Sequence, residues 1–255
     1  MGRFFMLWTA PDSPASRMGR RVLTRTRRRL ECAEPPNMGT PRTTDPEPPL
    51  SSPERLALAA RRAYAAAPKA RWDDGRIRER YARRALDAIR GDGDACYMNP
   101  CLDYALLMAD DLARAPGGGA RVEAAFGRDA EGREAAHFWT VWETPEGPWY
   151  AEQRRLNDVR VAPGDAAEPY AGWTGSWRQT LVDARDLDPR LPLPELARGA
   201  VRTALRAILD AKLDRLVACN SQENWERFLG LVRGDVSRPR ILTTHSTPPS
   251  LRPAA

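Results

Sequence analysis

The chain has 255 residues, of which 42% are hydrophobic and 29% are charged, and its formal net charge is +6 at pH 7. This length and composition allow a sizeable core in one large domain or two small ones, which excludes a small scaffold held together by disulfides. Residues 1–50 contain nine arginines against five acidic residues, so they carry +4 of the net charge. The rest of the chain is nearly balanced, and we expect no nucleic-acid partner for it.

Four cysteines and no secretory signal predict free thiols in a reducing compartment, so we expect a cytoplasmic protein. The apolar patch Phe4–Trp8 is too short for the core of a signal peptide. No stretch of the sequence is long and apolar enough to span a bilayer, and we therefore expect no membrane partner.

Residues 1–52 lack hydrophobic periodicity and are rich in Arg, Pro, Ser and Thr, which predicts a disordered basic tail. The run Arg25–Arg29 could bind nucleic acid or an acidic surface, but a solvated tail is the simpler interpretation. A folded domain is expected over residues 53–185, beginning at a helix start formed by Ser52, Pro53 and Glu54.

Helices are predicted over residues 53–66 and 75–90, followed by a third that contains a cysteine. Asn99 is a suitable N-cap for this third helix and Pro100 a suitable first helical residue, which places Cys101 in the first turn. A thiol there lies near unpaired N–H groups at the positive end of the helix dipole, and its pKa is lowered. The alternative is that Cys101 is only a small buried hydrophobic residue.

Strands are predicted next in the chain, over residues 120–126, 136–143 and 148–152. The last two should form a hairpin, with the turn at residues 144–147. We expect a loop over residues 163–177 and a further strand over residues 178–184. Helices over residues 196–219 and 222–232 then form a helical extension, residues 186–233, packed on the core, and residues 234–255 a disordered tail.

The hairpin brings a histidine and a carboxylate together. The chain has only two histidines, and one of them, His245, lies in the C-terminal tail, so a cysteine enzyme would use His137. If Glu143 and Pro148 flank the turn, His137 and Glu152 are diagonal neighbours on one face of the hairpin, and a glutamate can bridge that separation. Cys101, His137 and Glu152 would then supply a nucleophile, a base and an orienting group.

Several segments resemble the signature of the transglutaminase-like superfamily. Cys101–Leu107 is similar to its C-x-D-Y-A-x-L motif, and Leu112–Arg114 followed by Gly119–Val122 to its helix end and next strand. His137–Trp139 is similar to H-x-W, and Trp149–Glu152 stands where W-x-x-D is usual. Glu152 thus replaces the usual aspartate, and the resemblance covers about residues 80–155.

The resemblance implies an α+β fold with a papain/transglutaminase-like core, in which the cysteine helix packs on an antiparallel sheet with flanking helices. It implies a cysteine hydrolase or acyltransferase that acts on a peptide or protein amide through a Cys101–His137–Glu152 triad and a thioester. We expect a peptidase, amidase or deamidase rather than a cross-linking transglutaminase, without a cofactor or a metal; the oligomeric state stays open. The alternative is an inactive fold used as a protein-interaction module, with a basic tail able to bind nucleic acid.

Two other roles for the cysteines are considered. Cys96 could form a disulfide with an oxidised Cys101 if the two approach closely enough, but a loop thiol is the simpler interpretation. A zinc site made of Cys96, Cys101 and His137 lacks both the usual C-x₂₋₄-C pairing and a fourth ligand. We therefore expect no metal site.

Overall fold

The computed structural model describes seven segments of the chain: residues 50–65, 70–92, 100–115, 119–155, 158–164, 173–232 and 240–243. Their helices are α1 (Ser52–Ala65), α2 (Asp74–Arg80), α3 (Leu86–Asp92), α4 (Cys101–Ala113), α5 (Leu193–Leu196), α6 (Gly199–Cys219), α7 (Gln222–Val232) and the short 3-10 helix η1 (Ala184–Asp186). Their strands are β1 (Ala120–Arg128), β2 (Glu134–Thr144), β3 (Gly147–Arg155), β4 (Asp158–Pro163), β5 (Thr174–Asp183) and β6 (Arg240–Thr243). The predicted N-terminal tail lies outside these segments as far as residue 49.

The described strands form one six-stranded sheet in the order β5-β1-β2-β3-β4-β6. Neighbouring strands are antiparallel except for β4 and β6, which are parallel. Short connections join β1 to β2, β2 to β3 and β3 to β4, and antiparallel neighbours permit such connections. The protein is therefore of the mixed α+β class with a mostly antiparallel sheet, as predicted.

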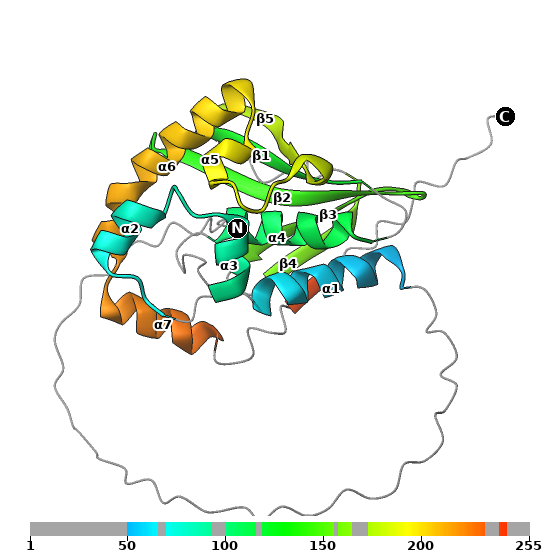
Figure 1. Ribbon diagram of the computed structural model, residues 1–255, viewed down its shortest axis with the longest axis horizontal. Coiled ribbons are helices and arrows are strands. Elements are labelled where there is room, and N and C mark those ends of the chain that lie inside the picture. Colours follow the sequence, from blue (N-terminus) through cyan, green and yellow to red (C-terminus); the bar gives the residue numbers. More distant parts are fainter. Residues whose placement is uncertain are drawn as a thin grey trace, which may run out of the picture. The chain divides into compact units, whose positions relative to one another are not determined.

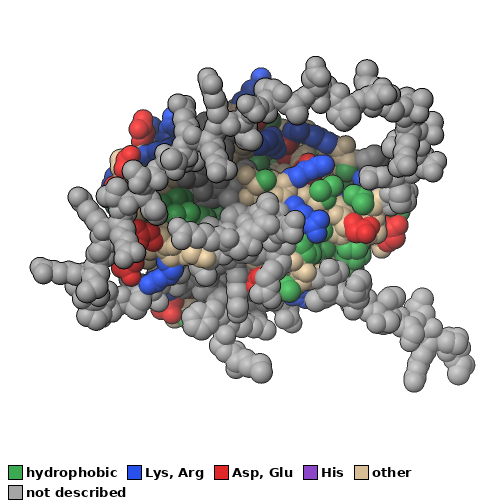
Figure 2. Space-filling model, turned by 90° about the horizontal axis from the view of Figure 1, so that it is seen from below, with side chains coloured by type: hydrophobic (Ala, Val, Ile, Leu, Met, Phe, Trp, Pro, Cys, Tyr) green, Lys and Arg blue, Asp and Glu red, His purple; other side chains and the backbone are tan. Residues whose placement is uncertain are grey.

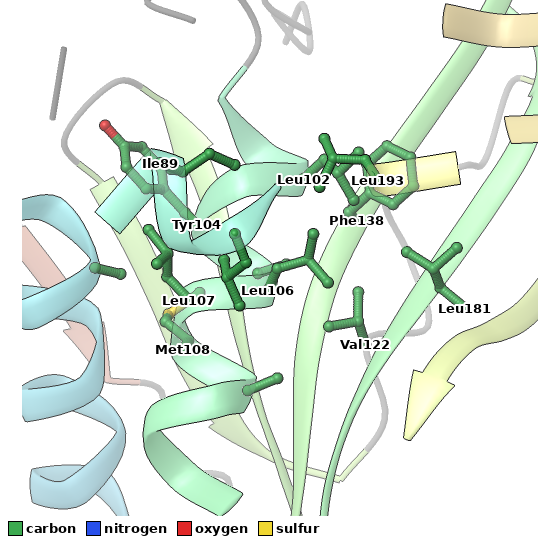
Figure 3. Packing of buried hydrophobic residues seen from close by; sticks show 14 of the residues in the cluster. Ile89, Leu102, Tyr104, Leu106, Leu107, Met108, Val122, Phe138, Leu181 and Leu193 are labelled. Carbon is green, nitrogen blue, oxygen red and sulfur yellow. The ribbon is translucent and has the colours of Figure 1, made fainter. Parts of the chain in front are cut away.

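Helix α4 packs on one face of this sheet, against β1 and β2, and α1 lies beside it (Figure 1). Figure 3 shows part of the resulting core, in which Leu102 of α4 lies with Phe138 of β2 and Leu193 of α5. The same core continues to Leu205 of α6 and Phe228 of α7. The C-terminal helices and the cysteine helix thus share one hydrophobic core.

The opposite face of the sheet carries a second, smaller cluster of buried side chains. Its members are Ala125, Trp139, Val141, Tyr150 and Ala162. Two guanidinium groups add to it, because Arg178 lies over the ring of Trp139 and Arg160 over that of Tyr150. The middle of the sheet is therefore buried on both faces.

Glu123 of β1 shows how this sheet accommodates a charged side chain between its two buried faces. This residue is buried, and it forms ion pairs with Arg121 and Arg178. Burying a carboxylate costs free energy because the group loses its hydration, and here two cations compensate for that loss.

The single helix predicted over residues 75–90 is two helices, α2 and α3, separated by a turn. Backbone groups at the break bond to a distant segment instead of continuing the helix. The N–H of Leu193 donates to the carbonyl of Arg84, and the N–H of Asp87 donates to that of Pro189. A tertiary contact thus overrides a helical pattern in the sequence.

Three strand assignments also differ from the predicted ones. β4 was not predicted, and β6 lies inside residues 234–255, which were expected to form a disordered tail. β5 begins at Thr174 rather than at residue 178, so Trp177 belongs to a strand, where its ring stacks on Phe126 at a centroid distance of 4.7 Å. The parallel pairing of β6 with β4 joins segments far apart in the sequence, which local patterns do not reveal.

The long C-terminal helices agree with the prediction. α6 buries Leu205, Leu209 and Leu216 along one side, and α7 spans the predicted residues 222–232. Among the described residues, no helix combines the length and hydrophobicity that a membrane span needs. Basic, acidic and hydrophobic side chains are interspersed on the part of the surface that Figure 2 shows.

Candidate active site

Cys101 is the first residue of α4. Pro100 precedes the helix as its N-cap, and its carbonyl accepts the first helical hydrogen bond, from Tyr104 N–H, at 3.0 Å. The prediction had placed Pro100 one position further into the helix, and the predicted cap Asn99 lies outside the described residues. The first N–H groups of a helix have no partner within it, so the half-buried Cys101 lies where an anion is stabilised.

Contacts along α4 fix the position of this helix start. The hydroxyl of Thr140 on β2 donates to the carbonyl of Ala105 at 2.8 Å, which ties the helix to the sheet. The ring of Tyr104 stacks on Tyr64 of α1 with centroids 4.1 Å apart. Asp103 is fully buried and forms an ion pair with Arg84. Cys101 is therefore the end of a helix that is held from three sides.

The hairpin of β2 and β3 has the predicted register. Glu143 faces Pro148, and the last ladder pair at the far end is Thr140 with Ala151. His137 and Glu152 lie beyond that pair, and His137 Nε2 is 3.1 Å from Glu152 Oε1. Only 12% of the His137 side chain and 4% of the Glu152 side chain are exposed. The predicted diagonal contact between histidine and carboxylate is thus present.

The imidazole of His137 also forms a hydrogen bond with Cys101, and the two groups shift each other's pKa. Burial on its own would raise the pKa of the Cys101 thiol, but the hydrogen bond and positive charge of His137, aided by Lys212, bring it below its ordinary value. Burial would lower the pKa of His137, but its hydrogen bonds to Cys101 and Glu152 raise it to about 9. Both shifts favour a thiolate beside an imidazolium.

The other cysteines are placed differently. Cys219 is half-buried in the last turn of α6, where its carbonyl accepts a hydrogen bond from Asn224. Cys32 and Cys96 lie outside the described residues, so the loop thiol expected at Cys96 and the alternative of a disulfide with Cys101 both stay predictions. Of the cysteines that are described, Cys101 is the one bonded to a histidine.

Sequence reasoning missed Lys212 of α6, whose charge acts on Cys101. A signal for it was present in the spacing, since Lys212 lies three residues after Leu209 and four before Leu216, both of which are buried. These spacings place the three side chains on one face of a helix. A lysine on such a face is read as an interruption of the hydrophobic stripe unless its position in space is known.

The described part of the chain contains no group of three or more His, Cys, Asp or Glu residues arranged to hold a metal ion. The chain matches no protein-family model, no curated protein and no solved structure. The geometry around Cys101, His137 and Glu152 is therefore what supports a function.

Replacing Glu152 with glutamine should lower the alkylation rate of Cys101 by iodoacetamide at pH 7 by about tenfold, the factor that corresponds to one pKa unit. The carboxylate helps to raise the pKa of His137, so its loss lets the imidazolium deprotonate at lower pH and leaves the thiolate with a neutral partner. Glu143→Gln is a matched control, because Glu143 lies in the same hairpin, on β2, but is exposed and bonded to Arg121. An unchanged alkylation rate in Glu152→Gln would show that Glu152 has no part in activating Cys101.

Proposed function

We propose that this protein is a cysteine-dependent amide hydrolase or acyl transferase in which Cys101 is the nucleophile, His137 the base and Glu152 the group that orients the imidazole. The observation that carries the proposal is a largely buried imidazole bonded on one side to a carboxylate and on the other to a thiol at a helix start.

The reaction would begin with the Cys101 thiolate, whose proton resides on His137. The sulfur attacks the amide carbonyl, and the negative charge that develops on the carbonyl oxygen is met by the backbone N–H of Cys101 at the helix start. The C–N bond then breaks, and the imidazolium gives its proton to the leaving amine. Cys101 is left as a thioester. His137 is left as a neutral imidazole that can activate the next nucleophile.

Whether the reaction is a hydrolysis or an acyl transfer depends on which nucleophile attacks the thioester, water or an amine. We favour water, and hence a peptidase, amidase or deamidase, because water needs no binding site for an acceptor amine. The resemblance to the transglutaminase-like superfamily supports the same thiol chemistry and a papain-like core. A cysteine helix packed on an antiparallel sheet is consistent with that core.

The test uses p-nitrophenyl acetate on the full chain, followed by mass spectrometry of peptides. We expect an acetyl group on Cys101 that is removed by hydrolysis with time. The variant Cys101→Ala should show no such transient acetyl group. In the control Cys219→Ala, the acetylation of Cys101 should be unchanged. Equal acetylation of Cys219, or the same rate at Cys101 in urea-unfolded protein, would contradict the proposal.

The alternative role as an interaction module with a nucleic-acid-binding tail depends on the arginines of residues 1–49, which lie outside the described part of the chain. It predicts binding that weakens steeply with salt. That measurement is independent of the thiol chemistry.

A further inference from the structure

Lys212 lies on the inward side of α6. It is four residues from Ile208, three from Leu209 and four from Leu216, and these three side chains are buried. Lys212 itself is half-buried. Helix α6 packs against α2 and against β2, the strand that carries His137 (Figure 1). Lys212 thus lies on the side of α6 that packs inward, and this helix borders the strand of the candidate active site.

No carboxylate of the described residues neutralises this ammonium. Glu152 is bonded to His137, and Asp103 is paired with Arg84. On α6 itself, Asp210 and Asp214 are exposed, and Asp214 pairs with Arg78. Taking a cation partly out of water costs free energy unless an anion compensates for it.

The anion whose charge acts on Lys212 is the thiolate of Cys101. Burial lowers the pKa of Lys212, the charge of Cys101 raises it in part, and Arg215 lowers it further. In return, Lys212 helps to lower the pKa of Cys101. The interaction between the two side chains is one of charge, since neither pKa shift includes a hydrogen bond between them.

We propose that Lys212 binds a carboxylate of the substrate and so selects acyl compounds that carry a negative charge close to the carbonyl attacked by Cys101. This inference rests on the proposed function. A chain end is one source of such a group, because the last peptide bond of a chain has a free carboxylate one residue away.

The change of charge during the reaction explains why a carboxylate fits there. When Cys101 becomes a thioester, its negative charge is lost, and the half-buried ammonium loses the anion whose charge acts on it. A substrate carboxylate beside Lys212 compensates for the ammonium throughout acylation. It also holds the neighbouring carbonyl near the sulfur, and such positioning is a large part of enzymatic rate enhancement.

The test compares two alkylating probes of nearly equal shape, iodoacetate and iodoacetamide. Both react by the same displacement, in which the Cys101 sulfur forms a bond to carbon while the C–I bond breaks and iodide leaves. The ratio of the two rates at Cys101 in the full chain therefore cancels the fraction of thiolate and reports the preference for a carboxylate. N-acetylcysteine gives the ratio for a thiol without a protein around it.

We expect the ratio of iodoacetate to iodoacetamide rates to be about tenfold higher in the wild type than in Lys212→Met, a factor in the range of a hydrogen bond to a charged group. Lys212→Arg keeps the cation and should keep most of the preference. Arg206→Met is the matched control, because it removes one positive charge from the exposed side of the same helix and should leave the ratio unchanged.

Two results would overturn this inference while leaving the proposed function intact. In one, Lys212→Met lowers both rates by the same factor, which would mean that Lys212 only stabilises the thiolate. In the other, the wild-type ratio equals that of N-acetylcysteine. A Cys101 that reacts with neither probe in the folded protein would overturn both the inference and the proposed function. Circular dichroism of each variant establishes that it is folded.

Discussion

Replacing Arg84 with methionine should lower the free energy of unfolding by about 3–5 kcal/mol, the range observed when one partner of a buried ion pair is removed. The Arg84 and Asp103 side chains are 2% and 0% exposed, so the substitution removes from a buried carboxylate the cation with which it forms its ion pair. Arg84 also donates to the carbonyl of Tyr81 and lies over the rings of Tyr81 and Trp72. Its loss therefore affects the turn between α2 and α3 as well as the cysteine helix.

Urea-induced unfolding of the full chain measures this effect. Arg83→Met is a suitable control, because Arg83 is the exposed neighbour and its replacement should change the free energy of unfolding by less than about 0.5 kcal/mol. Adding Asp103→Asn to Arg84→Met should recover part of the loss, since an amide is less costly to bury than an unpaired carboxylate. A loss below about 1 kcal/mol in Arg84→Met would show that the pair contributes little.

Local patterns in the sequence were sufficient for the core of the candidate site. The turn at residues 144–147 determines the register of the hairpin, and the register in turn makes His137 and Glu152 diagonal neighbours. A proline and a run of apolar residues likewise identify the start of α4 within one residue. These features depend on contacts over short sequence separations, and the sequence records them directly.

Features that depend on distant segments could not be read in this way. The break between α2 and α3 results from hydrogen bonds to Pro189 and Leu193, about a hundred positions later in the chain. The position of β6 depends on parallel pairing with β4, and the charge of Lys212 matters only because the fold brings it within range of Cys101. Nothing in the residues near Cys101 indicates that a lysine of α6 acts on it.

Replacing His137 with glutamine should slow the alkylation of Cys101 by iodoacetamide at pH 7 by up to about 30-fold. The hydrogen bond and charge of His137 are what lower the pKa of Cys101 against the effect of burial. Without them the pKa should return to its ordinary value of about 8.5, so that only about 3% of the thiol is ionised at pH 7.

The dependence on pH gives the sharper result. In the wild type the pKa of Cys101 is lowered and that of His137 is raised to about 9, so the thiolate–imidazolium pair persists between the two values. Acyl transfer, which needs the imidazolium proton for the leaving group, should therefore fall above about pH 9. These two limits belong to the coupled pair rather than to either residue alone.

The pH–rate profiles for alkylation of Cys101 in the wild type and in His137→Gln should cross as the pH rises. A thiolate of higher pKa is intrinsically more nucleophilic, so His137→Gln should react more slowly than the wild type at pH 7 but faster near pH 10. Cys219, in the same molecule, serves as the internal reference thiol. Parallel pH profiles for Cys101 in the two proteins would show that His137 does not activate this thiol, because a change in folding or access alone shifts the rate equally at every pH.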